Sequence, residues 1–277
     1  MKTFIATAIS LCLGISAFAF DGSAFLAPAA GVKSYIKTDY LVSSKFGEYF
    51  RTPNVKYQHV FNNFGQEVEN TELTVDGKIV DKIVYEYDAA GRIVSQTGYD
   101  DSEYALWKIV NVYDKNGLKI EENEYNGEDL LYSKSLYKYA GNNCIDETYY
   151  NGNGALIWKN TFTYDEKDNC TAIYSYYANG SLESKRTFKF NDINKVQEIC
   201  YFDDDENLVK KELFRYDAKN VLTEVATYKA DNQLTLRQFY KYDAKGNVIK
   251  ITTYSIAKKF GTTVNELVGM SDFTYQY

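Results

Sequence analysis

Apolar and polar residues alternate along most of this chain in short runs, and turn-like sequences separate the runs. The runs "LYSKSLYKY" and "LTLRQFYKY" each end on an aromatic residue and carry a second aromatic residue two positions earlier. Residues at i and i+2 lie on one face of a strand, so these aromatic pairs share a face. A basic residue five positions before each end falls on the opposite face. The alternation predicts antiparallel strands with one aromatic face and one mixed face.

The aromatic residues that end these runs recur at spacings of 26, 26, 26, 25, 26, 26 and 26 residues, at Phe61, Tyr87, Tyr113, Tyr139, Tyr164, Phe190, Tyr216 and Tyr242. Asp or Asn follows the aromatic residue in every unit but one, where Ala140 follows it. Three residues further on stand Gly65, Gly91, Gly117, Asn143, Asp168, Asn194, Asn220 and Gly246. Asx side chains bond to the backbone ahead, and Gly, Asn and Asp tolerate a positive φ. Each "YDxxG" therefore predicts a hairpin tip made of a type I turn and a left-handed residue.

A second turn, such as "YNGEDL" or "YANGSL", lies midway through most units, so each unit holds two strands. We expect an all-β, single-domain antiparallel meander of about sixteen strands, forming a long twisted or coiling single sheet. Residues 20–55 are interpreted as a linker and N-terminal cap, and 56–277 as the β-repeat domain, with a C-terminal insertion at 255–270. Within the insertion, Thr263 and Glu266 fit a capping box and predict a short helix.

Residues 1–19 are typical of an export signal, with Lys2, an apolar core and the small-x-small site that ends at Ala19. We therefore expect a secreted, periplasmic or cell-surface protein with no membrane insertion. Removing Lys2 with the signal changes the net charge from -7 to -8. This balance argues against nucleic acid as a partner, because phosphates require basic patches.

The "[YF]DxxG" tips over residues 56–254 resemble the YD repeats of Rhs and teneurin proteins. The export signal, the tandem tips and the final strand "DFTYQY" are together similar to an uncharacterised family of secreted proteins from gut-associated anaerobic bacteria. The resemblance implies a β-strip fold. In the large relatives, YD repeats coil into a shell around a toxin or adhere to partners at surfaces. We expect no toxin shell here, and the repeat motif implies no catalytic residue.

Candidate catalytic chemistry depends on the single histidine, His59, which stands in a recurrent aromatic position and is interpreted as a structural substitute there. A Cys/His nucleophile needs it beside Cys144, Cys170 or Cys200. Cys144 lies about seven strands away, which is about 30 Å or more, so only closure of the sheet would bring the pair together. We expect no catalytic residue, no metal and no cofactor. The cysteines are interpreted as half-buried free thiols, with a bridge between Cys144 and Cys170 as the alternative.

Four glutamates stand one strand before a repeat Lys or Arg, across the second turn, in the pairs Glu69 with Lys82, Glu121 with Lys134, Glu198 with Lys211 and Glu224 with Arg237. This constant spacing predicts ion pairs between neighbouring strands. The acidic turn at 203–207 lacks the spacing of a calcium loop and is interpreted as solvated.

The chain holds 27 Tyr, 16 Phe and 2 Trp, more aromatic area than one thin sheet hides between layers. One interpretation is ring stacking that replaces a conventional core. The other is exposed aromatic platforms, for which Trp107, Trp158, Tyr137 and Tyr240 are the candidate ligand-binding residues. We expect a non-enzymatic binding or scaffold protein whose partner is a carbohydrate or an extracellular protein. A structural envelope element without a small ligand is the alternative.

Overall fold

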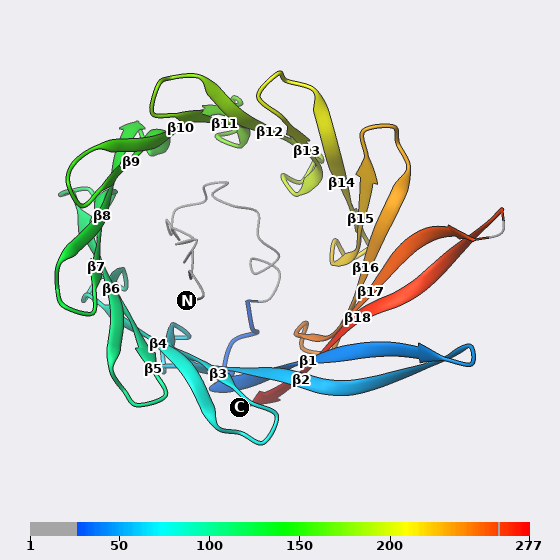
Figure 1. Ribbon diagram of the computed structural model, residues 1–277. Helices are drawn as coiled ribbons and strands as arrows, with labels where there is room; N and C mark the ends of the chain where they lie inside the picture. Colours follow the sequence, from blue (N-terminus) through cyan, green and yellow to red (C-terminus); the bar gives the residue numbers. More distant parts are fainter. Residues whose placement is uncertain (1–26, 260) are drawn as a thin grey trace.

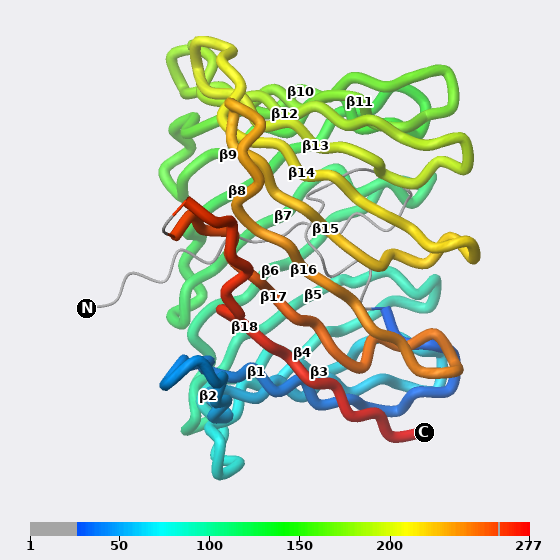
Figure 2. The backbone as a smooth tube through the Cα atoms, turned by 90° about the vertical axis from the view of Figure 1, so that its right-hand side faces the viewer, coloured from blue at the N-terminus to red at the C-terminus, as the bar shows by residue number. Residues whose placement is uncertain are grey.

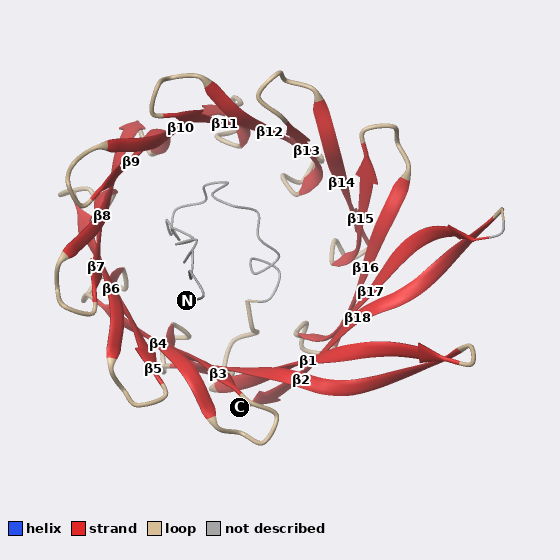
Figure 3. Ribbon diagram, in the orientation of Figure 1, coloured by secondary structure: helices blue, strands red, loops and turns tan. Residues whose placement is uncertain are grey.

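The computed structural model of the protein describes residues 27–259 and 261–277, whose regular structure is entirely β (Figure 3). The predicted export signal at 1–19 lies outside these residues. The strands are β1 (Ser34–Lys45), β2 (Glu48–Phe61), β3 (Glu67–Leu73), β4 (Ile79–Tyr87), β5 (Ile93–Asp100), β6 (Ala105–Tyr113), β7 (Lys119–Asn126), β8 (Leu131–Ala140), β9 (Asn143–Asn151), β10 (Leu156–Tyr164), β11 (Cys170–Tyr177), β12 (Leu182–Phe190), β13 (Val196–Phe202), β14 (Leu208–Tyr216), β15 (Leu222–Lys229), β16 (Leu234–Tyr242), β17 (Val248–Lys259) and β18 (Thr262–Gln276).

The eighteen strands form one sheet that closes on itself. Each strand pairs antiparallel with the next, and β1 pairs with both β2 and β18, so that Tyr35 lies opposite His59 on one side and Tyr275 on the other. Figures 1 and 2 show the resulting barrel. The predicted meander is confirmed, but the expectation of an open sheet of about sixteen strands is wrong. The two additional strands are β1 and β18, and β1 lies within the range 20–55 that we interpreted as a linker and cap.

The predicted tip turn is confirmed in most units. In the second unit, Oδ1 of Asp88 accepts the N–H groups of Ala90 and Arg92, both at 2.9 Å, and Gly91 takes a φ of 80°. The same turn recurs at the opposite end of the barrel, where Asp100 accepts two backbone N–H groups and Glu103 has a φ of 62°. Both ends of the barrel are therefore built from one local motif.

One tip differs from the prediction. In the unit without an Asx residue, Gly141 has a φ of 63°, and Asn143 is already the first residue of β9, paired with Ala140. The expectation that Asn143 takes the left-handed position is wrong. A tighter turn replaces the usual longer one, and this accounts for the one repeat that is a residue shorter than the others.

In most units, the recurrent tyrosine of the tip ties its hairpin to the preceding one. The hydroxyl of Tyr113 donates to the carbonyl of Ile93 at 2.8 Å, and that of Tyr216 donates to the carbonyl of Val196 at 2.7 Å. In both cases the acceptor lies 20 residues earlier. The same bond joins Tyr87 to Glu67, Tyr139 to Lys119, and Tyr164 to Cys144. These bonds form a tyrosine ladder that fixes one repeat against the next.

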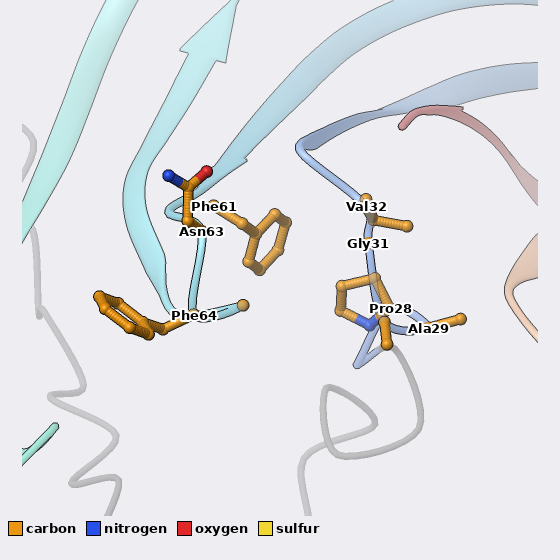
Figure 4. Close-up of a pocket in the computed structure, with 9 residues that line it drawn as sticks. Pro28, Ala29, Gly31, Val32, Phe61, Asn63 and Phe64 are labelled. Carbon is orange, nitrogen blue, oxygen red and sulfur yellow. The ribbon is translucent and has the colours of Figure 1, made fainter.

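The tip aromatic residues point into the barrel. Residues 27–33 lie inside the ring of strands in Figure 1, and the Phe61 ring points toward Pro28 and Val32 in Figure 4. We call this side of the sheet the inner wall. Side chains converge on a concave face, and the aromatic residues two positions before the tips, including Phe188 at 4% exposed and Phe214 at 6%, are buried there. The core is therefore a belt around the inner wall rather than a layer between two sheets.

The predicted helix near the C-terminus is wrong. Thr263 and Glu266 belong to β18, where they lie opposite Lys258 and Ser255 of β17, and Glu266 also pairs with Lys259. Cross-strand pairing thus overrides the local capping pattern. The hairpin β17–β18 and the hairpin β1–β2 are longer than the others and project from the ring (Figure 1). Within the described part of the chain, no helix has the length and apolarity needed to cross a membrane.

Replacing Tyr216 by Phe should lower the free energy of unfolding by about 1 kcal/mol, because it removes one bond of the tyrosine ladder and keeps the ring. Burial raises the pKa of Tyr216 to about 12, so the hydroxyl keeps its proton under ordinary conditions. Phe190 occupies this place one repeat earlier, which makes Phe190→Tyr the matched control, and it should lose no stability. Urea unfolding followed by circular dichroism measures both. Equal stability of Tyr216→Phe and the wild-type protein would contradict the role of the ladder.

Candidate functional site

The outer face of the barrel carries basic residues that are paired within the sheet. Most of them lie opposite an aromatic residue of the next strand, as Lys185 does with Phe202 and Arg237 with Tyr254. The predicted pairs Glu121–Lys134, at 3.1 Å, and Glu224–Arg237, at 2.6 Å, are confirmed. The other two predicted pairs, Glu69–Lys82 and Glu198–Lys211, are replaced by different partners: Lys82 pairs with Glu103, and Glu198 pairs with Lys189. The charged groups of the outer face are therefore paired with one another, and the candidate site lies on the inner wall.

The belt on the inner wall changes character around the barrel. From β10 to β17, each aromatic residue faces an aliphatic partner on the next strand, in the pairs Phe162–Ile173, Phe188–Ile199, Phe214–Val225 and Tyr240–Ile251. From β6 to β9, the corresponding pairs are Asn111–Glu122 and Tyr137–Glu147. We call the second stretch the polar sector. It is the part of the wall that departs most from what packing alone requires.

A buried ion pair anchors the polar sector. Nζ of Lys119 lies 2.8 Å from Oε2 of Glu122 and 4.7 Å from the centre of the Tyr137 ring, and the two charged side chains are 3% and 9% exposed. In most other repeats the residue at the position of Lys119 is apolar and buried, for example Cys144, Cys170, Val196 and Leu222. A lysine at a position that is mostly apolar is a signal that the sequence contains, and our sequence reasoning missed it.

Glu147 lies beside this pair and accepts a hydrogen bond from Nδ2 of Asn160 at 2.9 Å. Burial raises the pKa of the Glu147 carboxyl, and the charge of Glu122 raises it further. The bonds from Asn160 and Tyr137 and the charge of Lys119 oppose these effects without overcoming them. The sector thus offers buried carboxylates and amides as fixed hydrogen-bonding groups.

Three aromatic side chains lie next to the polar sector, nearer the end of the barrel opposite the "YDxxG" tips. Tyr149 on β9 and Trp158 on β10 stack with ring centres 4.9 Å apart and planes 3° from parallel. Tyr177 on β11 is the partner of Trp158 on the other side and is 47% exposed. We call Tyr149, Trp158 and Tyr177 the aromatic platform. At its edge, Ser133 donates to Oε2 of Glu124 at 2.7 Å, so a carboxylate is available beside the rings.

All four predicted ligand-binding residues lie on the inner wall, but the structure does not gather them into one site. Tyr137 and Tyr240 are 5% and 9% exposed and belong to the belt. Trp107 lies flat on Gly98, where a Cβ atom would come within 2.3 Å of Cε2 of the indole. Trp158 alone joins the aromatic platform. Tyr149 and Tyr177 were missed, because the strand pairing that places them beside Trp158 is not evident in the repeat pattern.

The histidine and the cysteines do not come together. Nδ1 of His59 lies 2.5 Å from Oε1 of Glu67, and its ring stacks on Tyr35 at 4.3 Å, as expected for a residue of the aromatic row. In the closed barrel, Cys144 on β9 is still seven strands from His59 on β2 in one direction and eleven strands in the other.

The cysteines of the described chain are free, so the alternative of a bridge between Cys144 and Cys170 is wrong. Burial raises the pKa of the Cys170 thiol to about 12, which keeps it unreactive. Residues 27–259 and 261–277 hold no group of three His, Cys, Asp or Glu side chains arranged to bind a metal ion.

No protein-family model and no curated protein matches this chain. A porin-like protein from Bacteroides uniformis is 11% identical over 90% of this chain and 99% of its own, with a TM-score of 0.50. A porin-like protein from Bacteroides vulgatus is 11% identical over 88% of this chain and 98% of its own, with a TM-score of 0.32. The Tc holotoxin pore of Photorhabdus luminescens is 10% identical over 76% of this chain and 16% of its own, with a TM-score of 0.19. The first likeness shows a shared antiparallel β-barrel fold.

Two glutamates should make stability depend on pH in opposite directions. The raised pKa of Glu147 means that the folded protein holds this proton after the unfolded chain has released it, so its contribution to stability falls as pH rises. Glu147→Gln keeps the oxygen that accepts the bond from Asn160 and removes the loss of stability that follows ionisation of Glu147. It should stabilise the protein at neutral pH and have no effect below the carboxyl pKa of the unfolded chain.

The matched control is Glu224→Gln on the outer face. Burial pushes the pKa of Glu224 up, but the bonds and charges of Arg237 and Arg215 outweigh burial and hold it below its usual range. The contribution of Glu224 is therefore present at neutral pH and lost as pH falls through the folded pKa. Glu224→Gln should destabilise at neutral pH, and less in acid. Urea unfolding at both pH values measures the two variants, and effects of the same sign would contradict the assignment.

Proposed function

We propose that this protein is a non-enzymatic binding barrel that holds a glycan against its inner wall. The observation that carries the proposal is the aromatic platform, in which Tyr149, Trp158 and Tyr177 are neighbours across three strands and the rings of Tyr149 and Trp158 stack on each other. Aromatic rings offer flat apolar faces that suit the C–H faces of sugar rings. The adjacent carboxylates and amides of the polar sector offer hydrogen bonds to hydroxyl groups, the combination found in small-molecule sites.

The proposed location is the cell envelope or the surroundings of the cell, in agreement with the predicted export signal. The repeat tips support a relation to YD-repeat proteins, which we propose on the motif alone. We further propose that the barrel stands in water. Its outer face carries the repeat basic residues and their acidic partners, such as Lys159 with Asp146 at 2.6 Å, whereas a barrel in lipid presents an apolar band.

Replacing Trp158 by Ala should weaken glycan binding about tenfold, because it removes the central ring of the platform. The experiment applies residues 20–277 to an array of host and bacterial glycans and then measures affinity for the best ligand by calorimetry. The matched control is Trp107→Ala, since Trp107 also lies on the inner wall but packs against Gly98. A blank array with folded protein, or equal losses in the two variants, would contradict the proposal.

A second candidate function is association between copies of the chain. The pairing of β1 with β18 stops at Tyr40 and Met270, so beyond this point both projecting hairpins have unpaired edges. In the β1–β2 hairpin, Leu41, Phe46 and Phe50 are 61%, 104% and 49% exposed. Phe46 also has a φ of 54°, unusual for a bulky residue. An unpaired edge with exposed apolar side chains can be completed by the same edge of a second copy through a two-fold axis.

The double variant Phe46→Asn, Phe50→Ser tests this association. The wild-type protein should be a dimer at micromolar concentration and the variant a monomer, as measured by size-exclusion chromatography with light scattering. Asn accepts the left-handed conformation, so the hairpin itself should persist. Phe64, which is 89% exposed at a tip turn, supplies the control Phe64→Ser, which should remain dimeric. A wild-type monomer at all concentrations would overturn this candidate.

A further inference from the structure

Charge on the inner wall of β7, β8 and β9 is unbalanced. Glu122, Glu124 and Glu147 face inward with a single basic residue, Lys119, and Lys119 is already paired with Glu122. The outer faces of the same strands are balanced, for example by the pair Glu121–Lys134. With every carboxyl ionised, three carboxylates and one ammonium group leave this part of the inner wall with a net charge of two negative units.

The polar sector also has a surplus of acceptors. Asn111 is 8% exposed, and its Nδ2 donates to the carbonyl of Ile93 at 2.9 Å. Its Oδ1 is directed to the same wall as its cross-strand partner Glu122, and it has no hydrogen-bond partner among the described residues. A buried acceptor left unpaired is destabilising, because it has lost its hydrogen bond to water. A donor group that reaches this oxygen would remove the destabilisation, whereas another acceptor would increase it.

Glu124 is the carboxylate that a ligand on the aromatic platform meets first. It accepts a bond from Ser133, and its charge acts on Tyr149 of the platform. Glu147, by contrast, is 8% exposed and bonded to Asn160. A cation beside Glu124 would also contact the faces of the platform rings, and aromatic faces attract ammonium groups.

We propose that the inner-wall site selects glycans that carry a protonated amine, that is, amino sugars with a free amino group. This inference rests on the proposed glycan site and names its ligand class. The ammonium group lies against Glu124 and the face of Tyr149 or Trp158, and the sugar rings cover the remainder of the platform. An N-acetylated sugar lacks the charge, and an acidic sugar is repelled by Glu122, Glu124 and Glu147.

The test compares two trimers of one sugar, the glucosamine trimer with free amines and its N-acetylated form, by calorimetry on residues 20–277 at a pH where the amines are charged. The amine form should bind about tenfold more tightly, and this advantage should shrink at high salt. Glu124→Gln should abolish the advantage, so that the two trimers bind with equal affinity. The matched control Glu121→Gln makes the same charge change on the outer face of the same strand and should keep the advantage.

The outcomes separate the two proposals. Binding of the N-acetylated trimer at equal or higher affinity overturns the selection for amines and leaves the glycan site standing. An advantage that survives Glu124→Gln overturns the assignment of the ammonium group to Glu124. Absence of binding by both trimers, together with a blank glycan array, overturns the glycan site itself. The comparison on the wild-type protein needs no variant, so it decides the matter even where Glu124→Gln fails to fold.

Discussion

The pairing of β1 with both β2 and β18 is the interaction on which the remainder of the structure depends. Twelve residue pairs join β1 to β2 and seven join it to β18. Without β1, both β2 and β18 would expose a long unpaired edge, which proteins generally avoid. Closure also creates the concave surface on which the aromatic belt is buried. An open sheet of the same sequence would leave these rings exposed to water on one side.

Within the closed barrel, the repeats supply regularity and the departures from the repeats supply chemistry. The Asx turn, the tyrosine ladder and the aromatic belt recur from unit to unit and account for the fold. The polar sector breaks this pattern at Asn111, Lys119, Glu122 and Glu147, where most other repeats have aromatic or aliphatic residues. Such substitutions do not improve packing, because buried charges require partners. Their position next to the aromatic platform is the reason for assigning the site to this part of the wall.

Local pattern predicted much of the fold and little of the site. The strand runs, the tip turns and the assignment of aromatic and basic residues to opposite faces follow from the alternation of side chains along a strand and from turn chemistry. Closure was not predictable in this way, because β1 lies outside the repeat register and pairs with β18 at the far end of the chain. The same holds for the platform. Trp158 was identified as a candidate, but Tyr149 and Tyr177 join it only through cross-strand register.

The most direct measurement is a crystal structure of residues 20–277 grown with the glucosamine trimer. The account predicts a closed barrel with β1 between β2 and β18, a sugar ring against Trp158 on the inner wall, and an amine within hydrogen-bond distance of Glu124. A sheet left open at β1, or a trimer bound to the outer face of a closed barrel, would contradict the claim that the inner wall is the binding surface.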